Sequence, residues 1–396
     1  MAGAPAFLPN HSPRHRSLAA AYLFCALLTL SAVASAQSET DNWTRCEGKN
    51  PDLSIRACTA LIQSARQDDE NLAVALNNRG IAYDVKGQHD LAIADFTHAI
   101  QLKPDYAGAF SNRASAHAAR GELDFAILDF NQAIQLKPDD ASAFNLRGSA
   151  YSAMGEPNLA IADFTRAIQL KPDFADAFSS RGNAYADQRK FSPAIADYTQ
   201  ALRFTPNNAA TLFDRGAAYL VTTQLDFALA DFDRAIRLRP NFPEAFNNRG
   251  IARHNQHQEL LAIADFDQAI RLQPNYAAAY SNRCVSRSIA GSLQAALDDC
   301  NHALSLHAGD PSTLDSRGLL YLRMKNPAAA LADYNAALAI SPNKASSLFG
   351  RGITHRMLGD TISAEADLAA AKAIQPGITD QFSKWGLAPS PDRSKP

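Results

Sequence analysis

The chain repeats one pattern of residues every 34 positions, and this period restricts its fold more than any other feature. Arg, Ala and Asp each return at a fixed place in nine consecutive copies, and no insertion interrupts the period. The Arg series is Arg79, Arg113, Arg147, Arg181, Arg215, Arg249, Arg283, Arg317 and Arg351. The Asp series is Asp95, Asp129, Asp163, Asp197, Asp231, Asp265, Asp299, Asp333 and Asp367. A length of 396 residues would suggest two or three unrelated domains, whereas this pattern indicates one small unit copied along the chain.

The apolar residues of each copy recur at helical spacing. In the first copy, Leu76 and Tyr83 share one helix face, and Ala92 and Phe96 share a face in a second segment. Gly87 separates the two segments. Because a single pair of helices cannot bury both of its faces, neighbouring pairs have to stack into a continuous core. We therefore expect an all-α chain of tandem helix–turn–helix copies.

Turn residues predict where these helices begin and end. Pro104 and its equivalents are expected to close the second helix of each copy. Asp90 is expected to cap that second helix at its start. Asp105, or the Asp or Asn in its place in other copies, is expected to cap the next first helix.

The copies resemble the tetratricopeptide repeat family, whose helical pair has small residues at positions 8, 20 and 27, aromatic residues at 11 and 24, and Pro at 32. Counting Ala73 as position 1, these places hold Gly80, Ala92, Ala99, Tyr83, Phe96 and Pro104. The matching copies are 73–106, 107–140, 141–174, 175–208, 209–242, 243–276, 277–310, 311–344 and 345–378. The resemblance implies a right-handed α–α superhelical solenoid whose first helices line a concave groove.

The first 36 residues have the pattern of an export signal. Arg14 and Arg16 precede an uncharged apolar run at 18–33, and a small-x-small cleavage site ends at Ala36. The run has 16 residues, fewer than the roughly 20 that span a bilayer. We expect residues 1–36 to be a cleaved signal peptide of an exported bacterial protein, periplasmic or secreted. The alternative is an uncleaved segment that tethers the chain to the inner membrane.

Segments on either side of the copies are expected to cover the ends of the array. Residues 37–72 suggest a shortened helical pair, broken at Asn50-Pro51, that caps the first copy. Residues 379–396 suggest a short capping helix with Phe382 and Trp385, followed by a polar tail. A solenoid needs such caps because its terminal copies would otherwise expose apolar faces.

Four cysteines follow the signal segment, and four cysteines allow three pairings. Cys46 and Cys58 lie in the two halves of the N-terminal cap. Cys284 and Cys300 occupy positions 8 and 24 of the seventh copy, where other copies place a small and an aromatic residue. Export makes oxidation plausible, so we expect disulfides Cys46–Cys58 and Cys284–Cys300. The alternative is four buried thiols that act as small apolar side chains.

The Arg at position 7 departs from the family pattern, which usually has Leu there. Each Arg is accompanied by an Asp at position 23 of the same copy. The simplest interpretation is an internal ion pair repeated in every copy, which fixes register more than it adds stability. The alternative is a functional row of Arg side chains in the groove.

Catalytic motifs are missing from the sequence. It has no glycine-rich phosphate loop, nucleophile elbow or zinc motif, and the repeat accounts for residues 73–378. His254 and His257 replace a turn in the sixth copy, but without neighbouring ligands a solvated loop is the better interpretation. We therefore expect no enzyme, no metal and no cofactor. The net charge of −2 argues against a nucleic-acid partner.

The groove positions that the resemblance implies are rich in Asn. These residues are Asn78, Asn112, Asn248 and Asn282 at position 6, and Asn77, Asn145 and Asn247 at position 5. A row of Asn can hydrogen-bond the backbone of an extended peptide, as in the asparagine ladder of some long members of the family. The alternative is solvated Asn on an exposed helix face. Phe213 and Phe349, also at position 5, are either apolar anchors in the groove or buried contacts between helices.

Acidic residues outnumber basic ones at these groove positions, and no copy has Lys or Arg at positions 2, 5 or 6. Recognition of an acidic C-terminal motif is therefore not supported. We expect a non-enzymatic interaction scaffold of the cell envelope that binds an extended segment of a protein partner, with no membrane span in the mature chain. The alternatives are a module that binds glycan or polysaccharide, or an accessory subunit of an envelope enzyme.

Overall fold

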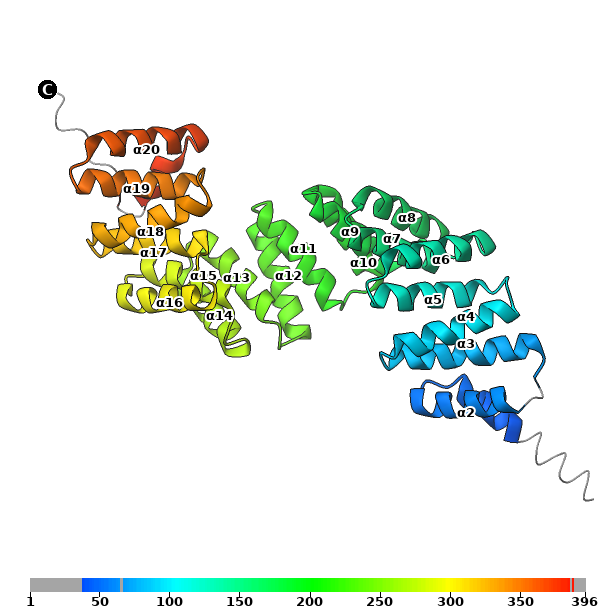
Figure 1. The fold of residues 1–396 in the computed structure, drawn as a ribbon. Helices are drawn as coiled ribbons and strands as arrows, with labels where there is room; N and C mark the ends of the chain where they lie inside the picture. Colours follow the sequence, from blue (N-terminus) through cyan, green and yellow to red (C-terminus); the bar gives the residue numbers. More distant parts are fainter. Residues whose placement is uncertain (1–37, 65–66, 385–386, 388–396) are drawn as a thin grey trace, which may run out of the picture. The chain divides into compact units, whose positions relative to one another are not determined.

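A computed structural model describes residues 38–64, 67–384 and 387, and all of their regular structure is helical (Figure 1). The expected all-α fold is confirmed. The expected signal segment at 1–36 and Trp385 lie outside the described residues. No helix within the described ranges combines the length and apolar character needed to span a membrane.

The chain divides into two compact units, Met1–Asp173 and Phe174–Pro396. In the first unit, residues 38–46 are helical and are followed by α2 (Pro51–Gln63), α3 (Asp69–Val85), α4 (His89–Leu102), α5 (Ala107–Ala119), α6 (Leu123–Leu136), α7 (Ala141–Ala153) and α8 (Pro157–Leu170). The second unit begins with α9 (Ala175–Asp187), α10 (Phe191–Phe204), α11 (Ala209–Val221), α12 (Leu225–Leu238), α13 (Pro243–Asn255), α14 (Glu259–Leu272) and α15 (Ala277–Ile289). It continues with α16 (Leu293–Leu306), α17 (Pro311–Arg323), α18 (Pro327–Ile340), α19 (Ala345–Met357), α20 (Thr361–Ile374) and α21 (Ile378–Lys384).

Consecutive helices pack in pairs, and neighbouring pairs stack within each unit (Figure 1). In the first unit α3 packs on α4, α4 on α5 and α5 on α6. The first helices of adjacent copies also touch: α3 contacts α5, and α13 contacts α15. This is the packing that the 34-residue period predicts, because each pair buries its second face against the next pair.

Small and aromatic residues fix how closely the two helices of a copy approach. In the first copy Ala92 and Ala99 are fully buried, and Phe96 is 1% exposed. A Cβ atom added at Gly80 would come within 2.6 Å of Phe96 Cε1. At this position the first helix of the copy therefore needs glycine, because even an alanine Cβ would meet the ring of the second helix.

The expected turns form, but the expected caps are displaced. Gly87 adopts φ 72° between α3 and α4, as a chain-reversing glycine should. Asp90 is not a cap, because α4 already begins at His89 and Asp90 lies in its first turn. Asp105 is not a cap either, because the turn after Pro104 extends to Tyr106, which precedes α5.

The cap side chains occur one residue later than expected, in only some of the copies. Asp140 accepts hydrogen bonds from Ser142 and Ala143 N–H, Asn208 does the same for α11, and Asp310 accepts from Thr313 N–H. In the first copy Asp68 caps α3 by accepting from Asn71 N–H, whereas Tyr106 makes no side-chain cap bond at the start of α5.

Buried side chains cover both ends of the array. At the N-terminal end Asn50 caps α2, and Cys46, Cys58 and Leu61 pack with Ala75 of α3. At the C-terminal end Ile378 and Phe382 of α21 are 0% and 1% exposed. They join a cluster that includes Phe349 and Leu368 of the last copy.

Candidate functional site

The Arg at position 7 pairs with the second helix of its own copy and can also reach a third helix, as Arg215 does. Arg215 Nε and Nη2 donate to both carboxylate oxygens of Asp231 at 2.7 and 2.8 Å, and Nη1 donates to Thr199 Oγ1 of the preceding copy at 3.1 Å. These bonds to Asp231 raise the pKa of Arg215. The same bidentate pair forms at Arg79–Asp95, Arg113–Asp129, Arg147–Asp163, Arg181–Asp197, Arg249–Asp265, Arg283–Asp299, Arg317–Asp333 and Arg351–Asp367.

The third guanidinium contact reaches back along the array. Arg147 donates to Asn131 at 2.6 Å and Arg283 to Asp267 at 2.5 Å, both on the second helix of the previous copy. In the first copy Arg79 reaches Thr59 of α2, so the N-terminal cap supplies the contact that a preceding copy would make. This geometry places the Arg series between helices and leaves it little capacity to hold a ligand.

Two copies add a second Arg to the pair. Arg253 Nη1 donates to Asp265 at 2.8 Å, and Arg287 Nη1 donates to Asp299 at 2.9 Å. Arg253 lies at the position where the first copy has Tyr83. The loss of the aromatic residue in these copies is thus accompanied by a denser charge network inside the fold.

The Asn residues form two clusters with the same arrangement, one in each unit. In the first Asn triad (Asn77, Asn78 and Asn112), Asn112 Nδ2 donates to Asn77 Oδ1 at 2.9 Å, and Asn77 Nδ2 donates to Asn78 Oδ1 at 3.5 Å.

The second Asn triad (Asn247, Asn248 and Asn282) repeats these bonds at 2.9 and 3.3 Å. The central residues Asn77 and Asn247 are buried, at 5% and 4% exposure. The Asn row is therefore two short chains of amides rather than a continuous ladder.

Each Asn triad leaves one donor and one acceptor at its ends. Within the described part of the chain, no partner is recorded for Asn78 Nδ2 or for Asn112 Oδ1, and both side chains are partly exposed. The same holds for Asn248 Nδ2 and Asn282 Oδ1. An amide N–H and an amide C=O on one surface match the C=O and N–H of an extended peptide.

Asn145 does not belong to either Asn triad. Its Oδ1 is buried, and within the described residues it has no hydrogen-bond partner. The neighbouring position 6 holds Leu146, which is 39% exposed, so the donor that Asn78 offers has no counterpart in this copy.

The two phenylalanines proposed as anchors lie among helices. Phe349 is fully buried, and its ring centroid is 4.7 Å from that of Phe382, so it is not available to a ligand. Phe213 packs 4.8 Å from Phe242 and 5.9 Å from Phe232. The C-terminal cap covers Phe349, so contacts between helices describe this residue, whereas Phe213 is half-buried and its choice between the two interpretations stays open.

Several of the expected groove acids are bonded within the protein. Asp84 lies 2.7 Å from His89 Nδ1, and Asp315 accepts from Ser347 and Ser346 at 2.6 and 2.8 Å. Burial raises the pKa of Asp315. Asp214 is half-buried without a recorded partner among the described residues, and burial raises its pKa to about 6. The groove is therefore less acidic toward a ligand than a count of carboxylates suggests.

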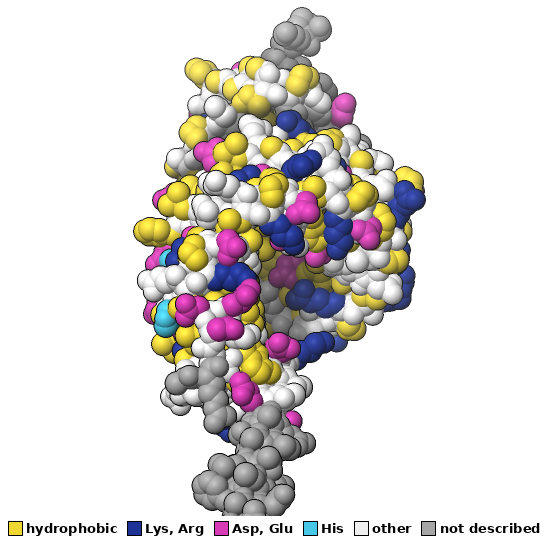
Figure 2. Space-filling model, turned by 90° about the vertical axis from the view of Figure 1, so that its right-hand side faces the viewer, with side chains coloured by type: hydrophobic (Ala, Val, Ile, Leu, Met, Phe, Trp, Pro, Cys, Tyr) yellow, Lys and Arg dark blue, Asp and Glu magenta, His cyan; other side chains and the backbone are white. Residues whose placement is uncertain are grey.

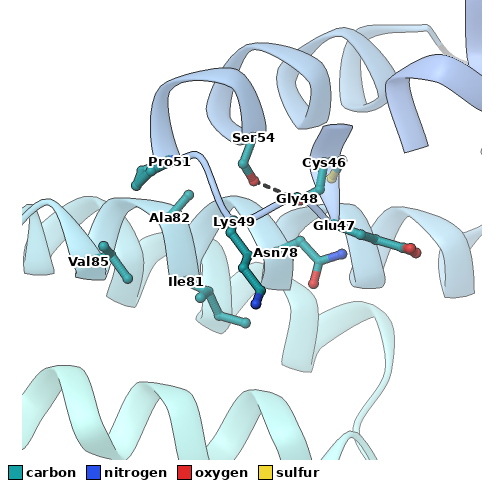
Figure 3. A pocket seen from close by; sticks show the side chains of 10 residues that line it. All are labelled: Cys46, Glu47, Gly48, Lys49, Pro51, Ser54, Asn78, Ile81, Ala82 and Val85. Atoms are coloured by element: carbon teal, nitrogen blue, oxygen red, sulfur yellow. Dashed lines mark hydrogen bonds between the residues drawn. The ribbon is translucent and has the colours of Figure 1, made fainter. Parts of the chain in front are cut away.

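A cavity of about 310 Å³ lies where the N-terminal cap meets α3 (Figure 3). The loop at 47–50 and the start of α2 form one side, and Asn78, Ile81 and Val85 of α3 form the other. In Figure 3 the Lys49 side chain extends from the loop toward Ile81 and Asn78, while the Glu47 carboxylate points away from Lys49. Lys49 was not among the predicted site residues, because it precedes the first copy and lies outside the 34-residue period.

Other candidate chemistry is sparse. His254 lies 3.0 Å from Glu259 and 3.3 Å from Ser286 Oγ. No group of three or more potential metal-binding side chains occurs in the part of the chain that the structure describes. Figure 2 shows acidic and basic side chains intermixed on the face it presents.

Comparison with known families gives matches along the array. A TPR repeat model matches residues 114–155 and 182–221. Two tetratricopeptide repeat models match residues 73–106 and 141–174, and residues 213–277 and 316–377. Together these matches span more than half of the chain. No curated protein matches it.

Solved structures share the fold at low sequence identity. The Cut9–Hcn1 complex of the APC/C is 21% identical with a TM-score of 0.53, over 76% of this chain and 59% of that one. A repeat protein from Parabacteroides merdae is 17% identical with a TM-score of 0.50, over 65% of this chain and 98% of that one. YrrB, described as having an unusual peptide-binding site, is 24% identical with a TM-score of 0.42, over 46% of this chain and 95% of its own.

Proposed function

Because the chain belongs to the tetratricopeptide repeat family, we propose that it is a non-catalytic scaffold that holds an extended segment of a partner protein against its first helices. Repeat solenoids of this kind generally serve as protein-interaction surfaces. The observation that supports peptide binding here is the pair of Asn triads. Each offers a backbone-like donor and acceptor, so a peptide can be held through its main chain with little regard to its sequence.

The internal bonds of each Asn triad favour binding because they fix the outer amides before a ligand arrives. Asn77 is buried and holds Asn78 through its Nδ2 and Asn112 through its Oδ1. A preorganised amide loses less rotamer freedom on binding than a solvated one does. The same argument holds for Asn247 and its neighbours.

A single isosteric change tests this role. In Asn78→Asp and Asn248→Asp, the inward oxygen still accepts from the central Asn, but the outward donor becomes an acceptor. Photo-cross-linking in cells, with the probe at Ser115 beside the first Asn triad, should capture a partner with the wild-type chain and lose it with these variants. The matched control is Asn241→Asp, because three other copies already have Asp in that exposed turn.

The outcome separates the possible surfaces. A partner captured equally by the wild type and by both variants would remove the Asn triads from the binding site. Capture only by a probe at Leu128, which is 64% exposed on a second helix, would place binding on that helix face instead. No captured protein under any condition would favour a glycan ligand over a protein.

We also propose that the protein works in the cell envelope after export. Two disulfides support this location, because such bonds persist mainly in oxidising compartments. Thiol labelling of denatured protein from freshly quenched cells should then find Cys46, Cys58, Cys284 and Cys300 unreactive. Four labelled thiols would contradict an envelope location.

A further inference from the structure

Two positions near the end of each copy change together along the array. The first three copies have Gln at position 29 and Asp at position 33, whereas the next three have Arg and Asn there. The earlier residues are Gln101, Gln135 and Gln169 with Asp105, Asp139 and Asp173. The later residues, which form the Arg–Asn stripe, are Arg203, Arg237 and Arg271 with Asn207, Asn241 and Asn275. Each of these later copies therefore gains a positive charge and loses a negative one at this place.

The Arg–Asn stripe lies on the second unit, where one copy joins the next. Each Arg is in the last turn of a second helix, α10, α12 or α14, and each Asn is in the turn that follows (Figure 1). All six residues are exposed. Within the described residues, these Arg side chains have no recorded ion pair and these Asn side chains have no recorded hydrogen bond. The stripe therefore offers three cations and three amides to solvent.

The acidic side chains of the same helices do not neutralise the Arg–Asn stripe. On α10, α12 and α14 the Asp at position 23 is held by an Arg. Asp233 and Asp267 at position 25 lie closer to the stripe, and they pair with Arg of the next copy at 2.6 and 2.5 Å. The other acids on these helices, Asp226 and Glu259, lie in the first turn, at the opposite end from the stripe.

A contact between copies joins the stripe into one surface. Arg234 Nη2 of α12 donates to Pro206 O at 2.7 Å, in the turn that carries Asn207. The second helix of one copy therefore reaches the turn of the copy before it and adds a guanidinium there. Phe204 and Leu238, each directly after an Arg of the stripe, are 44% and 43% exposed. The surface thus presents cations, amides and apolar side chains next to one another.

A role in helix stability does not explain the whole pattern. A cation in the last turn of a helix interacts favourably with the helix dipole, and this accounts for Arg at position 29. It does not account for the loss of Asp at position 33 in the same three copies. Replacement of Asp by Asn removes a carboxylate four residues from the Arg, so the guanidinium stays available to a ligand.

The spacing of the cations indicates the kind of ligand. One Arg per copy places successive cations about 10 Å apart or more, since each lies on a different helix. A nucleic acid strand carries a phosphate roughly every 3.4 Å, which is far denser. The acids of a protein segment follow its sequence and have no fixed interval. A polysaccharide with one acid in each repeating unit does present carboxylates at a fixed interval, as the copies present Arg.

From these observations we propose that the Arg–Asn stripe binds an acidic polysaccharide along the fourth to sixth copies. The guanidinium groups bind the carboxylates, and the Asn amides bind sugar hydroxyls. Phe204 and Leu238 cover the apolar faces of the sugar rings. This inference goes beyond the proposed function, because it assigns a second ligand to the second helices and leaves the first helices to the peptide.

A short hyaluronan oligosaccharide tests the proposal, because it carries a carboxylate on every second sugar. Its matched control is the same oligosaccharide with the carboxylates reduced to alcohols. Calorimetry with the full-length protein should detect binding of the acidic chain at low ionic strength, and added salt should weaken it. No binding of the acidic chain, or equal binding of the reduced chain, would overturn the proposal.

Variants that copy the first three copies locate the site without disturbing the fold. Arg203→Gln, Arg237→Gln and Arg271→Gln together restore the residue that position 29 has elsewhere in this chain. We expect this triple variant to bind about tenfold more weakly, because each exposed ion pair contributes roughly two- to threefold. Lys190→Gln, at an exposed lysine at the other end of α10, should bind like the wild type. An unchanged affinity in the triple variant would remove the stripe from the site.

Two further comparisons separate this surface from other binding modes. Polyglutamate with the same number of carboxylates should bind more weakly than hyaluronan, and equal affinity would mean that the stripe accepts any polyanion. Asn241→Asp should weaken hyaluronan binding, because it places a carboxylate beside Arg237, whereas Asn78→Asp should leave it unchanged. Loss of hyaluronan binding in Asn78→Asp would place the polysaccharide on the first helices and contradict the proposal.

Discussion

At the scale of single residues, the Arg at position 7 and its Asp form an ion pair in which removal of one charge should cost more stability than removal of both. Asp231 is 4% exposed and receives two bonds from Arg215. Replacing the Arg alone leaves a buried carboxylate without a counter-charge. Replacing both residues by apolar ones leaves no buried charge, so only the packing of the side chains has to change. The pair therefore specifies how the helices fit together more than it adds net stability.

This asymmetry gives a double-variant prediction. Arg215→Met should lower the free energy of unfolding by about 3 kcal/mol, because Asp231 loses its counter-charge. Arg215→Met with Asp231→Leu should recover most of that loss. Urea unfolding followed by circular dichroism measures both. A double variant at least as unstable as the single one would show that the pair contributes net stability.

Asp214 gives a prediction about pH. Burial raises its pKa in the folded protein to about 6, against 3.8 in the unfolded chain. The folded state therefore binds this proton more tightly, and its contribution to stability falls as the pH rises from about 4 to about 6. Asp214→Asn should be more stable than wild type by about 1 kcal/mol at pH 7, after allowance for solvent screening, and equally stable near pH 4.

The control for Asp214 is Asp176→Asn, because Asp176 is exposed. Unfolding of all three proteins at pH 4, 5, 6 and 7 provides the comparison. A stability difference for Asp214→Asn that stays constant across this range would show that the carboxyl is not the source of the effect.

At the scale of helices, the seventh copy replaces a packing contact with a covalent one. Cys284 and Cys300 are bonded, fully buried and placed where the first copy has Gly80 and Phe96. A bridge that closes a loop of this length contributes about 3 kcal/mol. The helices α15 and α16 are thus held by a bond whose presence depends on the redox conditions.

Restoring the common residues should remove that dependence. Reductant should lower the free energy of unfolding of both proteins. The loss should be about 3 kcal/mol smaller for the variant with Cys284→Gly and Cys300→Phe than for the wild type, because the variant has no bridge in the seventh copy to lose. The bridge between Cys46 and Cys58 is present in both proteins, so the difference reports on the seventh copy alone. Equal losses would mean that the bridge between Cys284 and Cys300 does not stabilise the fold.

At the scale of the whole molecule, neighbouring copies within each unit contact one another, so stability should be local. Phe382 of α21 covers Phe349 in the last copy. Phe382→Ala should therefore destabilise the last copy by about 3 kcal/mol and speed amide exchange in α19 and α20. Exchange in α3 to α6 should stay the same. A uniform change along the chain would contradict local stability.

The same scale shows what could be predicted from the sequence. The period predicts the helix pairs and their stacking, because these follow from which residues share a face. It does not predict that Asn77 turns inward while Asn78 keeps a free donor, because adjacent residues differ in burial only once the next copy is in place. The sequence also left open whether Phe349 is a groove anchor or a buried contact, because its burial depends on α21, which follows the last copy. Lys49 lies outside the period altogether.

The joint that Arg makes between three helices has a consequence for how the array can change in length. Arg113, Arg147, Arg249 and Arg283 each donate two bonds to the Asp of their own copy and one to a side chain of the copy before. A chain that gained or lost one whole interior copy would restore every one of these bonds at the new junction. An insertion of another length within a helix would move Arg off the face that meets Asp and break these bonds. We therefore expect duplication or deletion of one whole interior copy to preserve these Arg contacts, because they repeat with the period.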